Sequence, residues 1–221
     1  MLDFLIKTAK GGLDSIVADL LKAATDKVKD KVSESFAIKN LEVLKENISR
    51  IGKVKTIFNP DLIVNLNDIF FEEAISFNDG EQIELSNFFS SNHVLIEGGP
   101  GQGKSMYLRR LCLNEGAYSS HIPIFIEFRN LKFKKSWRQE LFDAIGEFGI
   151  VLDDTLLDIL AKSEKILFIL DGFDEIPNNA RLKTANELET IARIYPNSHG
   201  FKSSTPVRTK SSVFLVTTVM P

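Results

Sequence analysis

The sequence predicts an α/β fold, in which a parallel β-sheet is flanked by helices and preceded by a small α-helical module. Three observations support this prediction. A short apolar run, Val94 to Ile96, leads into a glycine-rich stretch and a helical pattern, and a longer apolar run, Ile166 to Leu170, ends in Asp171. Strand-like and helical segments then alternate along the chain, which is typical of parallel strands joined by right-handed crossovers.

We expect three regions: a helical module over residues 1–52, a connector with a short β-hairpin over 53–91, and the α/β domain over 92–221. In the first region, Gly11-Gly12 separates two helices, and a further helix runs from about Ile38 to Ile51. The first two helices carry an apolar stripe with a spacing of about 3.6 residues. Its members are Leu2, Leu5, Ile6, Ala9, Leu13, Ile16, Val17, Leu20, Leu21, Ala24, Val28 and Val32.

The helical module shows no catalytic constellation, so we interpret it as a protein-interaction or scaffold module. The alternative is a membrane-active amphipathic helix. Lysines and acidic residues are balanced through Ser35, which gives little attraction to an anionic bilayer. In the connector, Asn59-Pro60-Asp61 predicts a turn, and Glu73 to Leu85 predicts two short strands around Asn78-Asp79-Gly80.

The glycine-rich stretch fits the pattern G-x-x-x-x-G-K-[ST] at every fixed position, which identifies a phosphate-binding P-loop. Glycines allow the backbone N–H groups to turn inward around phosphates. Lys104 is expected to reach the β- and γ-phosphates, and the Ser105 hydroxyl to ligate Mg²⁺. The nucleotide contacts are assigned to Gly98, Gly99, Pro100, Gly101, Gln102, Gly103, Lys104, Ser105 and Met106.

The second apolar run suits a central parallel strand that is covered on both faces. Asp171 then lies at the carboxyl end of that strand, where open α/β sheets bind ligands, and is expected to hold Mg²⁺ beside Ser105. Asp174 and Glu175 follow at once. We assign Glu175, followed by Asp174, to orienting or deprotonating the attacking water. A solvated acidic turn is the structural alternative.

The stretches GGPGQGKS and ILFILDGFDEI together resemble the NACHT branch of the STAND P-loop ATPases, with Gly172, Asp174 and Glu175 at positions typical of that branch. The resemblance covers about Asn59 to Pro221. It implies a P-loop NTPase fold and an ATP-binding switch that is locked with ADP and oligomerises with ATP. Bacterial relatives act in defence against phage and animal relatives are innate immune sensors; we expect a bacterial defence protein of this kind.

Further elements are expected after the P-loop helix: a strand from Ile122 to Phe128 and helices at Ser136–Phe148, Asp153–Lys162 and Ala180–Ile194. Ser136 is the expected N-cap of the first of these helices, with Gln139 three residues later. Arg129 follows the strand and could face the nucleotide, but a surface ion pair is the favoured interpretation. Trp137 is interpreted as a packing residue.

The carboxyl-terminal stretch departs from the family pattern. Val213 to Thr218 can form the strand that normally leads to a sensor arginine, yet no arginine stands before Pro221. The irregular stretch from Gly200 to Ser212 leaves two explanations open, a natural variant or out-of-frame sequence. The helical and winged-helix domains that clamp ADP in relatives are also missing, so we expect a truncated NACHT protein.

Composition excludes several other classes of protein. A net charge of −3 gives no reason to expect nucleic-acid binding. Cys112, the single cysteine, is expected in the core, and the three histidines lack zinc-site spacing. No apolar run reaches the ~20 residues of a transmembrane helix. The N-terminus does not resemble a signal peptide, which predicts a cytoplasmic protein.

Two functions follow as hypotheses. The first is a nucleotide switch that binds ATP or ADP with Mg²⁺, with possible ATP hydrolysis and a protein partner or self-association. The second is a truncated, non-hydrolysing interaction or scaffold protein that acts through its N-terminal helices. A metabolic kinase is a weaker third interpretation, because the substrate and lid elements of such kinases are not recognisable.

Overall fold

A four-stranded parallel sheet organises the part of the chain that the computed structural model describes, namely residues 34–71, 75–76, 82–83, 94–97, 101–118, 121–147, 166–194 and 216–219. The strands lie in the spatial order β5 (Val94–Glu97), β8 (Val216–Val219), β7 (Ile166–Asp171) and β6 (Ile122–Glu127). The last strand along the chain, β8, therefore lies between β5 and β7. It overlaps the strand expected from Val213 to Thr218 and ends one residue later, while residues 213–215 lie outside the described part of the chain.

The two longest strands, β6 and β7, pair in parallel from Ile122 opposite Ile166 to Glu127 opposite Asp171. Their apolar runs are unbroken because both faces of the sheet are covered. Alternate residues enter two separate cores. One core contains Ile122, Ile124, Ile126, Phe168 and Leu170, and the other contains Phe125, Leu167 and Ile169. The prediction of a central buried strand ending at Asp171 is therefore confirmed.

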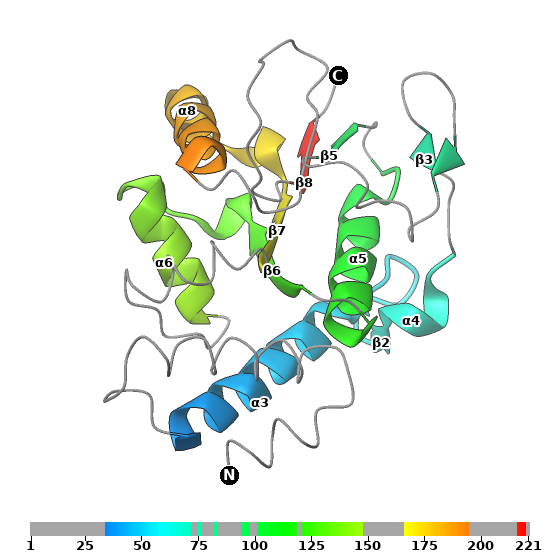
Figure 1. Ribbon diagram of the computed structural model, residues 1–221. Helices are drawn as coiled ribbons and strands as arrows, with labels where there is room; N and C mark the ends of the chain where they lie inside the picture. Colours follow the sequence, from blue (N-terminus) through cyan, green and yellow to red (C-terminus); the bar gives the residue numbers. More distant parts are fainter. Residues whose placement is uncertain are drawn as a thin grey trace.

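Helices cover both faces of this sheet (Figure 1). On one face, α5 (Lys104–Tyr118) packs its fully buried Leu108, Leu111 and Cys112 against β6 and β7. On the other face, α6 (Trp137–Glu147) and α8 (Asn178–Ile194) contribute Leu141, Ile145 and Leu188 to the first core. The predicted α/β fold, a parallel sheet flanked by helices, is confirmed.

The longest helix of the described residues, α3 (Glu34–Ile51), packs against the same sheet. Leu44 and Ile48 belong to the core that contains β6 and α6. The helix begins four residues before the expected Ile38, and residues 1–33 lie outside the described part of the chain. The division between modules at residue 52 stays a prediction, while the packing shows that α3 contributes to the core of the α/β domain.

A small hairpin follows α3 and was predicted only in its turn. Strands β1 (Lys53–Lys55) and β2 (Ile63–Asn65) pair antiparallel around the turn at Asn59-Pro60-Asp61. The backbone N–H of Leu62 donates to the Asn59 carbonyl at 3.3 Å and helps to close the turn. Helix α4 (Leu66–Ile69) comes next, and the Asn65 side chain caps it by accepting from the N–H of Asn67.

The second hairpin was predicted correctly. Strands β3 (Ile75–Ser76) and β4 (Gln82–Ile83) pair antiparallel on either side of Asn78-Asp79-Gly80. The predicted capping of α6 is also confirmed, because the Ser136 hydroxyl accepts from the N–H of Gln139 at 3.3 Å. The helix expected at Asp153–Lys162 and the side chain of Trp137 lie outside the described residues.

Candidate functional site

The described part of the P-loop has the backbone that phosphate binding requires. Gly101 and Gly103 have φ angles of 78° and 75°, a left-handed region that favours glycine. A Cβ atom built on either residue would meet nothing within 4 Å, so conformation, not crowding, selects glycine here. Helix α5 begins directly afterwards at Lys104, with the N–H of Tyr107 donating to the Gly103 carbonyl at 2.9 Å.

Among the predicted nucleotide contacts, Gly98, Gly99 and Pro100 lie outside the described residues, between the end of β5 and Gly101. Gly101, Gln102 and Gly103 form the exposed approach to α5, and Lys104, Ser105 and Met106 form its first turn. A helix N-terminus presents its free N–H groups and the positive end of its dipole to an anion. The described geometry therefore suits a phosphate group in front of α5.

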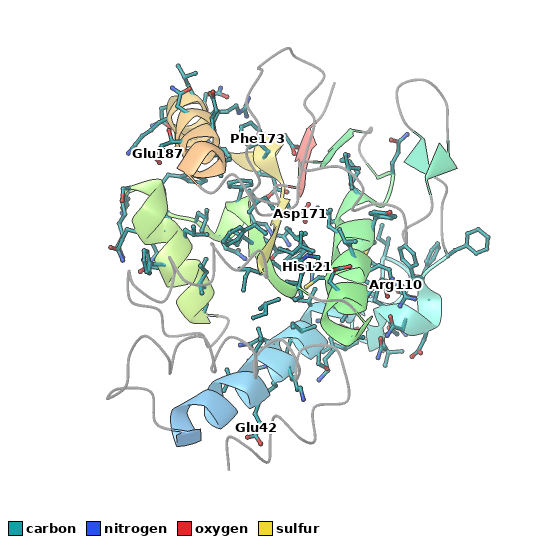
Figure 2. The ribbon with its side chains drawn as sticks, viewed as in Figure 1. Glu42, Arg110, His121, Asp171, Phe173 and Glu187 are labelled. Atoms are coloured by element: carbon teal, nitrogen blue, oxygen red, sulfur yellow. The ribbon has the colours of Figure 1, made fainter. Side chains whose placement is uncertain are left out.

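The two residues assigned to Mg²⁺ lie next to each other. Ser105 Oγ donates a hydrogen bond to Asp171 Oδ1 at 3.0 Å, although 66 positions separate the two residues in the chain. Asp171 is the last residue of β7, and its side chain is buried, with 6% of the residue exposed. Figure 2 shows Asp171 near the middle of the molecule, beside α5. A hydroxyl and a carboxylate oxygen are ligands that Mg²⁺ accepts.

Burial raises the pKa of the Asp171 carboxyl above its ordinary value. The hydrogen bond from Ser105 opposes this shift, the nearby Glu127 adds to it, and Arg109 and Arg129 counter it. A carboxylate with a raised pKa is held in its charged form at a cost in free energy. A divalent cation bound at the same oxygen removes that cost, so the electrostatics of Asp171 suit a metal ligand.

Glu127 is a residue that the motifs did not indicate. It ends β6 directly opposite Asp171 in the strand register. Its Oε1 accepts from Arg109 of α5 at 2.6 Å and also from Arg129, while its Oε2 accepts from Asn130 at 3.0 Å. The carboxylate is therefore already fully engaged, which indicates a structural role at the edge of the sheet. The predicted surface ion pair of Arg129 is confirmed.

Two short turns stand side by side at this edge. The 3₁₀ turn η2 (Phe128–Asn130) follows β6, and the 3₁₀ turn η3 (Phe173–Glu175) follows β7. The rings of Phe128 and Phe173 meet edge to face, with their centroids 5.7 Å apart. This geometry is favoured for aromatic pairs and joins the two turns through their first residues.

The predicted catalytic carboxylates, Asp174 and Glu175, lie in η3. The turn starts after Gly172, whose φ of 78° lets the chain leave β7 sharply, and the N–H of Glu175 donates to the Gly172 carbonyl at 2.9 Å. Glu175 is exposed and Asp174 is partly buried. Both side chains therefore belong to the same edge as Asp171, while their chemical roles stay predictions.

Arg181 of α8 contacts the backbone of η3, a contact that the sequence did not predict. Its Nη2 donates to the carbonyls of Asp174 at 2.9 Å and Ile176 at 3.1 Å. Its Nε is buried without a hydrogen-bond partner. The contact spans five to seven positions of chain, and no local motif in the sequence marks it.

Two further arginines connect α5 to the elements before the P-loop. Arg109 donates to the carbonyl of Ile51, the last residue of α3, at 3.1 Å, and stacks over Phe125 with 5.3 Å to the ring centroid. Arg110 donates to Asn67 and lies over Phe70 of the α4 end. Figure 2 shows Arg110 on the flank of α5 that faces α4. The P-loop helix is thereby bound to both α3 and α4.

Other side chains that could take part in chemistry lie apart from this edge. Cys112 is buried in α5, and burial raises the pKa of its thiol, as expected of a core cysteine. His121 Nδ1 lies 3.2 Å from Glu115 Oε2, at the opposite end of α5 from the P-loop. Within the described ranges, no helix is both long enough and apolar enough to cross a bilayer.

Comparison with known proteins identifies the family of this chain. The chain is 30% identical to Protein NLRC5 of Ictalurus punctatus over 133 residues, which make up 56% of this chain and 8% of that protein. The chain thus spans a small fraction of the length of this relative. The family model described as NACHT domain matches residues 92–213, more than half of the chain. The chain belongs to the NACHT domain family.

Proposed function

We propose that the chain is a nucleotide-dependent switch, which binds ATP and ADP with Mg²⁺ at the carboxyl edge of its parallel sheet. The NACHT domain implies nucleotide binding. The observation that carries the proposal is the 3.0 Å hydrogen bond between Ser105 Oγ and Asp171 Oδ1. It brings together the start of the P-loop helix and the end of β7, the two places from which P-loop NTPases hold Mg²⁺.

Each residue of this edge has a role in the proposal. The P-loop backbone and the N-terminus of α5 hold the phosphates, and Lys104 places a positive charge on the β- and γ-phosphates. Ser105 and Asp171 would supply two oxygen ligands to Mg²⁺. Bound Mg²⁺ supplies charge stabilisation to phosphoryl transfer.

Hydrolysis is the finer part of the proposal. Glu175 is exposed beside the metal ligand Asp171, which leaves its carboxylate accessible to a water molecule. We assign it to orienting that water and accepting its proton, with Asp174 as the second candidate. Arg181 fixes the backbone of η3 through two carbonyl groups, so it would keep both carboxylates in place.

The switch would act in signalling or in defence against phage, as the family resemblance implies. Arg109 supports communication within the chain, because it contacts both the end of α3 and Glu127, which lies opposite Asp171 in register. A change at the nucleotide edge would therefore reach α3 through one side chain. A protein partner or self-association, and a cytoplasmic location, complete the proposal.

Calorimetric titration of the purified chain with ATP and ADP, each with and without Mg²⁺, tests the proposal. Lys104→Ala is expected to weaken binding roughly ten- to hundredfold, because a charged hydrogen bond contributes about 1.5–3 kcal/mol. Lys183→Ala is the matched control, since Lys183 is exposed on α8 and pairs with Glu187. Equal affinity in the wild type and Lys104→Ala would refute the proposal.

The alternative is an interaction or scaffold module that does not respond to nucleotide. One observation favours it: large apolar side chains are exposed around the first hairpin and α4, namely Ile57, Phe58, Leu62, Ile63, Ile69 and Phe71. Exposed apolar groupings of this kind mark protein-binding surfaces. Sedimentation velocity separates the two functions, because a switch changes its association between ATP and ADP and a scaffold associates equally with both.

A further inference from the structure

We propose that Arg129 recognises the terminal phosphate of the bound nucleotide, so that this residue discriminates ATP from ADP. The inference rests on the proposed function, since it concerns the same nucleotide site. It goes further by assigning a residue outside the P-loop and outside the acidic turn. The P-loop alone explains affinity for a nucleotide but gives little preference between two and three phosphates.

The position of Arg129 in the fold supports this role. Arg129 is the second residue of η2, which follows β6, and Glu127 at the end of β6 lies opposite Asp171. The ring contact between Phe128 and Phe173 keeps η2 beside η3. A nucleotide with its phosphates at the start of α5 and its Mg²⁺ held by Ser105 and Asp171 would have its last phosphate near this edge, because the metal bridges β- and γ-phosphate oxygens.

The charged groups around Arg129 also support this role. Glu127 is the main cause that raises the pKa of the guanidinium, and Glu175 and Asp171 raise it further. Arg129 therefore lies within the electrostatic reach of both the proposed metal ligand and the proposed catalytic acid. A cation at this place offsets the repulsion between those carboxylates and an incoming phosphate.

The ion pair with Glu127 does not account for Arg129 by itself. More than half of the Arg129 side chain is exposed, at 55%, and exposed ion pairs contribute only about 0–1 kcal/mol to stability. Glu127 is also bound by Arg109 and Asn130. Glu127 instead anchors one side of the guanidinium and leaves its other donors for a ligand. A planar guanidinium suits a phosphate, which it binds through two parallel hydrogen bonds.

The experiment measures ATP and ADP affinities, with Mg²⁺, by calorimetry in the wild type, Arg129→Gln and Arg129→Lys. Arg129→Gln is expected to weaken ATP binding roughly tenfold or more, as expected for losing one charge-assisted contact. Its ADP affinity should change less than about threefold. Arg129→Lys should fall between the two, because lysine keeps the charge but loses the planar fork.

Arg110→Gln is the matched control, because Arg110 is on α5 but faces α4, away from the nucleotide edge. It should leave the ratio of ATP to ADP affinity unchanged. An unchanged ratio in Arg129→Gln, with ADP still bound, would overturn the role of Arg129 alone. Failure of the wild type to bind either nucleotide would instead overturn the proposed function, together with this inference.

Discussion

The turns η2 and η3 are built in the same way but carry opposite charge. Each follows a strand that ends in a carboxylate, Glu127 or Asp171, and each begins with a phenylalanine that packs against the other. The next residues are Arg129-Asn130 in η2 and Asp174-Glu175 in η3. The two phenylalanines thus serve packing, while the residues that differ between the turns are those to which we assign roles at the nucleotide.

A second difference lies in the strand-end carboxylates. Glu127 is bound by three side chains, whereas Asp171 accepts from Ser105 and is buried enough for its pKa to rise. The donors to Glu127 are two arginines and an asparagine, so its hydrogen bonds are made without a ligand. Asp171 gains more from a cation than Glu127 does.

Removing the ring contact between Phe128 and Phe173 should separate the two turns and produce the largest change in the free energy of unfolding. Phe128→Ala is expected to lower the free energy of unfolding by about 3–5 kcal/mol, because Phe128 is completely buried. Phe173→Ala should cost roughly 1–3 kcal/mol, since Phe173 is only partly buried. Urea denaturation of both single variants and the double variant measures the coupling, expected at about 0.5–1.5 kcal/mol. Strict additivity would show that the two turns are independent.

Neutralising each strand-end carboxylate should sharpen the contrast between them. Glu127→Gln is expected to lower the free energy of unfolding by about 1–3 kcal/mol, because it leaves the partly buried Arg109 without its ion-pair partner. Asp171→Asn should raise Tm in the absence of Mg²⁺ at neutral pH, and should abolish the effect of Mg²⁺ on nucleotide affinity. A fall in Tm of Asp171→Asn would contradict our account of its burial.

The contribution of Asp171 to the pH dependence of stability has a definite sign. The folded state raises the pKa of Asp171, so it binds this proton more tightly than the unfolded state does. The resulting stabilisation is fully present below the unfolded pKa and is lost as pH rises through the folded pKa. Without Mg²⁺, thermal melts of the wild type should show this decline across that window, and melts of Asp171→Asn should lack it.

Replacing Gly172, which directly precedes η3, should give the smallest change in stability and a larger change in ATP turnover. Gly172→Ala is expected to cost roughly 1–2 kcal/mol, because an alanine at φ 78° is strained. Its Cβ would also lie 3.1 Å from Glu175 Cδ and displace that carboxylate. ATP turnover should therefore fall while ADP affinity stays within about threefold.

Gly146→Ala provides the control for this variant. Gly146 lies within α6, and a Cβ there meets nothing within 4 Å. This substitution should stabilise the protein by about 0.5–1 kcal/mol, because alanine favours a helix over glycine. Equal loss of turnover in both variants would show that Gly172 has no special role at the site.

The sequence predicted the parts of the site that lie within short motifs. The P-loop, the start of α5 and the buried strand ending at Asp171 each depend on neighbouring residues, so residue type and spacing indicated them. The proximity of Ser105 and Asp171 followed from sheet topology, because carboxyl ends of parallel strands share one edge. The resemblance to a known family then joined two motifs that lie far apart in the chain.

The contacts that join distant segments could not be predicted in this way. Arg181 donates to a carbonyl group in η3, and Arg109 contacts both Ile51 and Glu127. The residues next to a helical arginine in the sequence do not indicate which distant group it will contact. The hairpin of β1 and β2 was also missed, because three-residue strands are too short to show alternation. The packing of α3 on the sheet likewise depends on tertiary contacts.

The place of β8 in the sheet bears on the order of events during synthesis. Val216–Val219 pairs with β5 along four positions and also contacts β7 at Ile169, so the strand that precedes the P-loop gains its described neighbour only after some 120 further residues have been translated. Until then, β5 lacks the partner with which it pairs in the described sheet, and the edge that β8 will occupy is open to other chains. Chaperones could bind a nascent chain at this stage. A nucleotide that binds only after β8 has paired would shift the folding equilibrium toward the complete sheet by mass action.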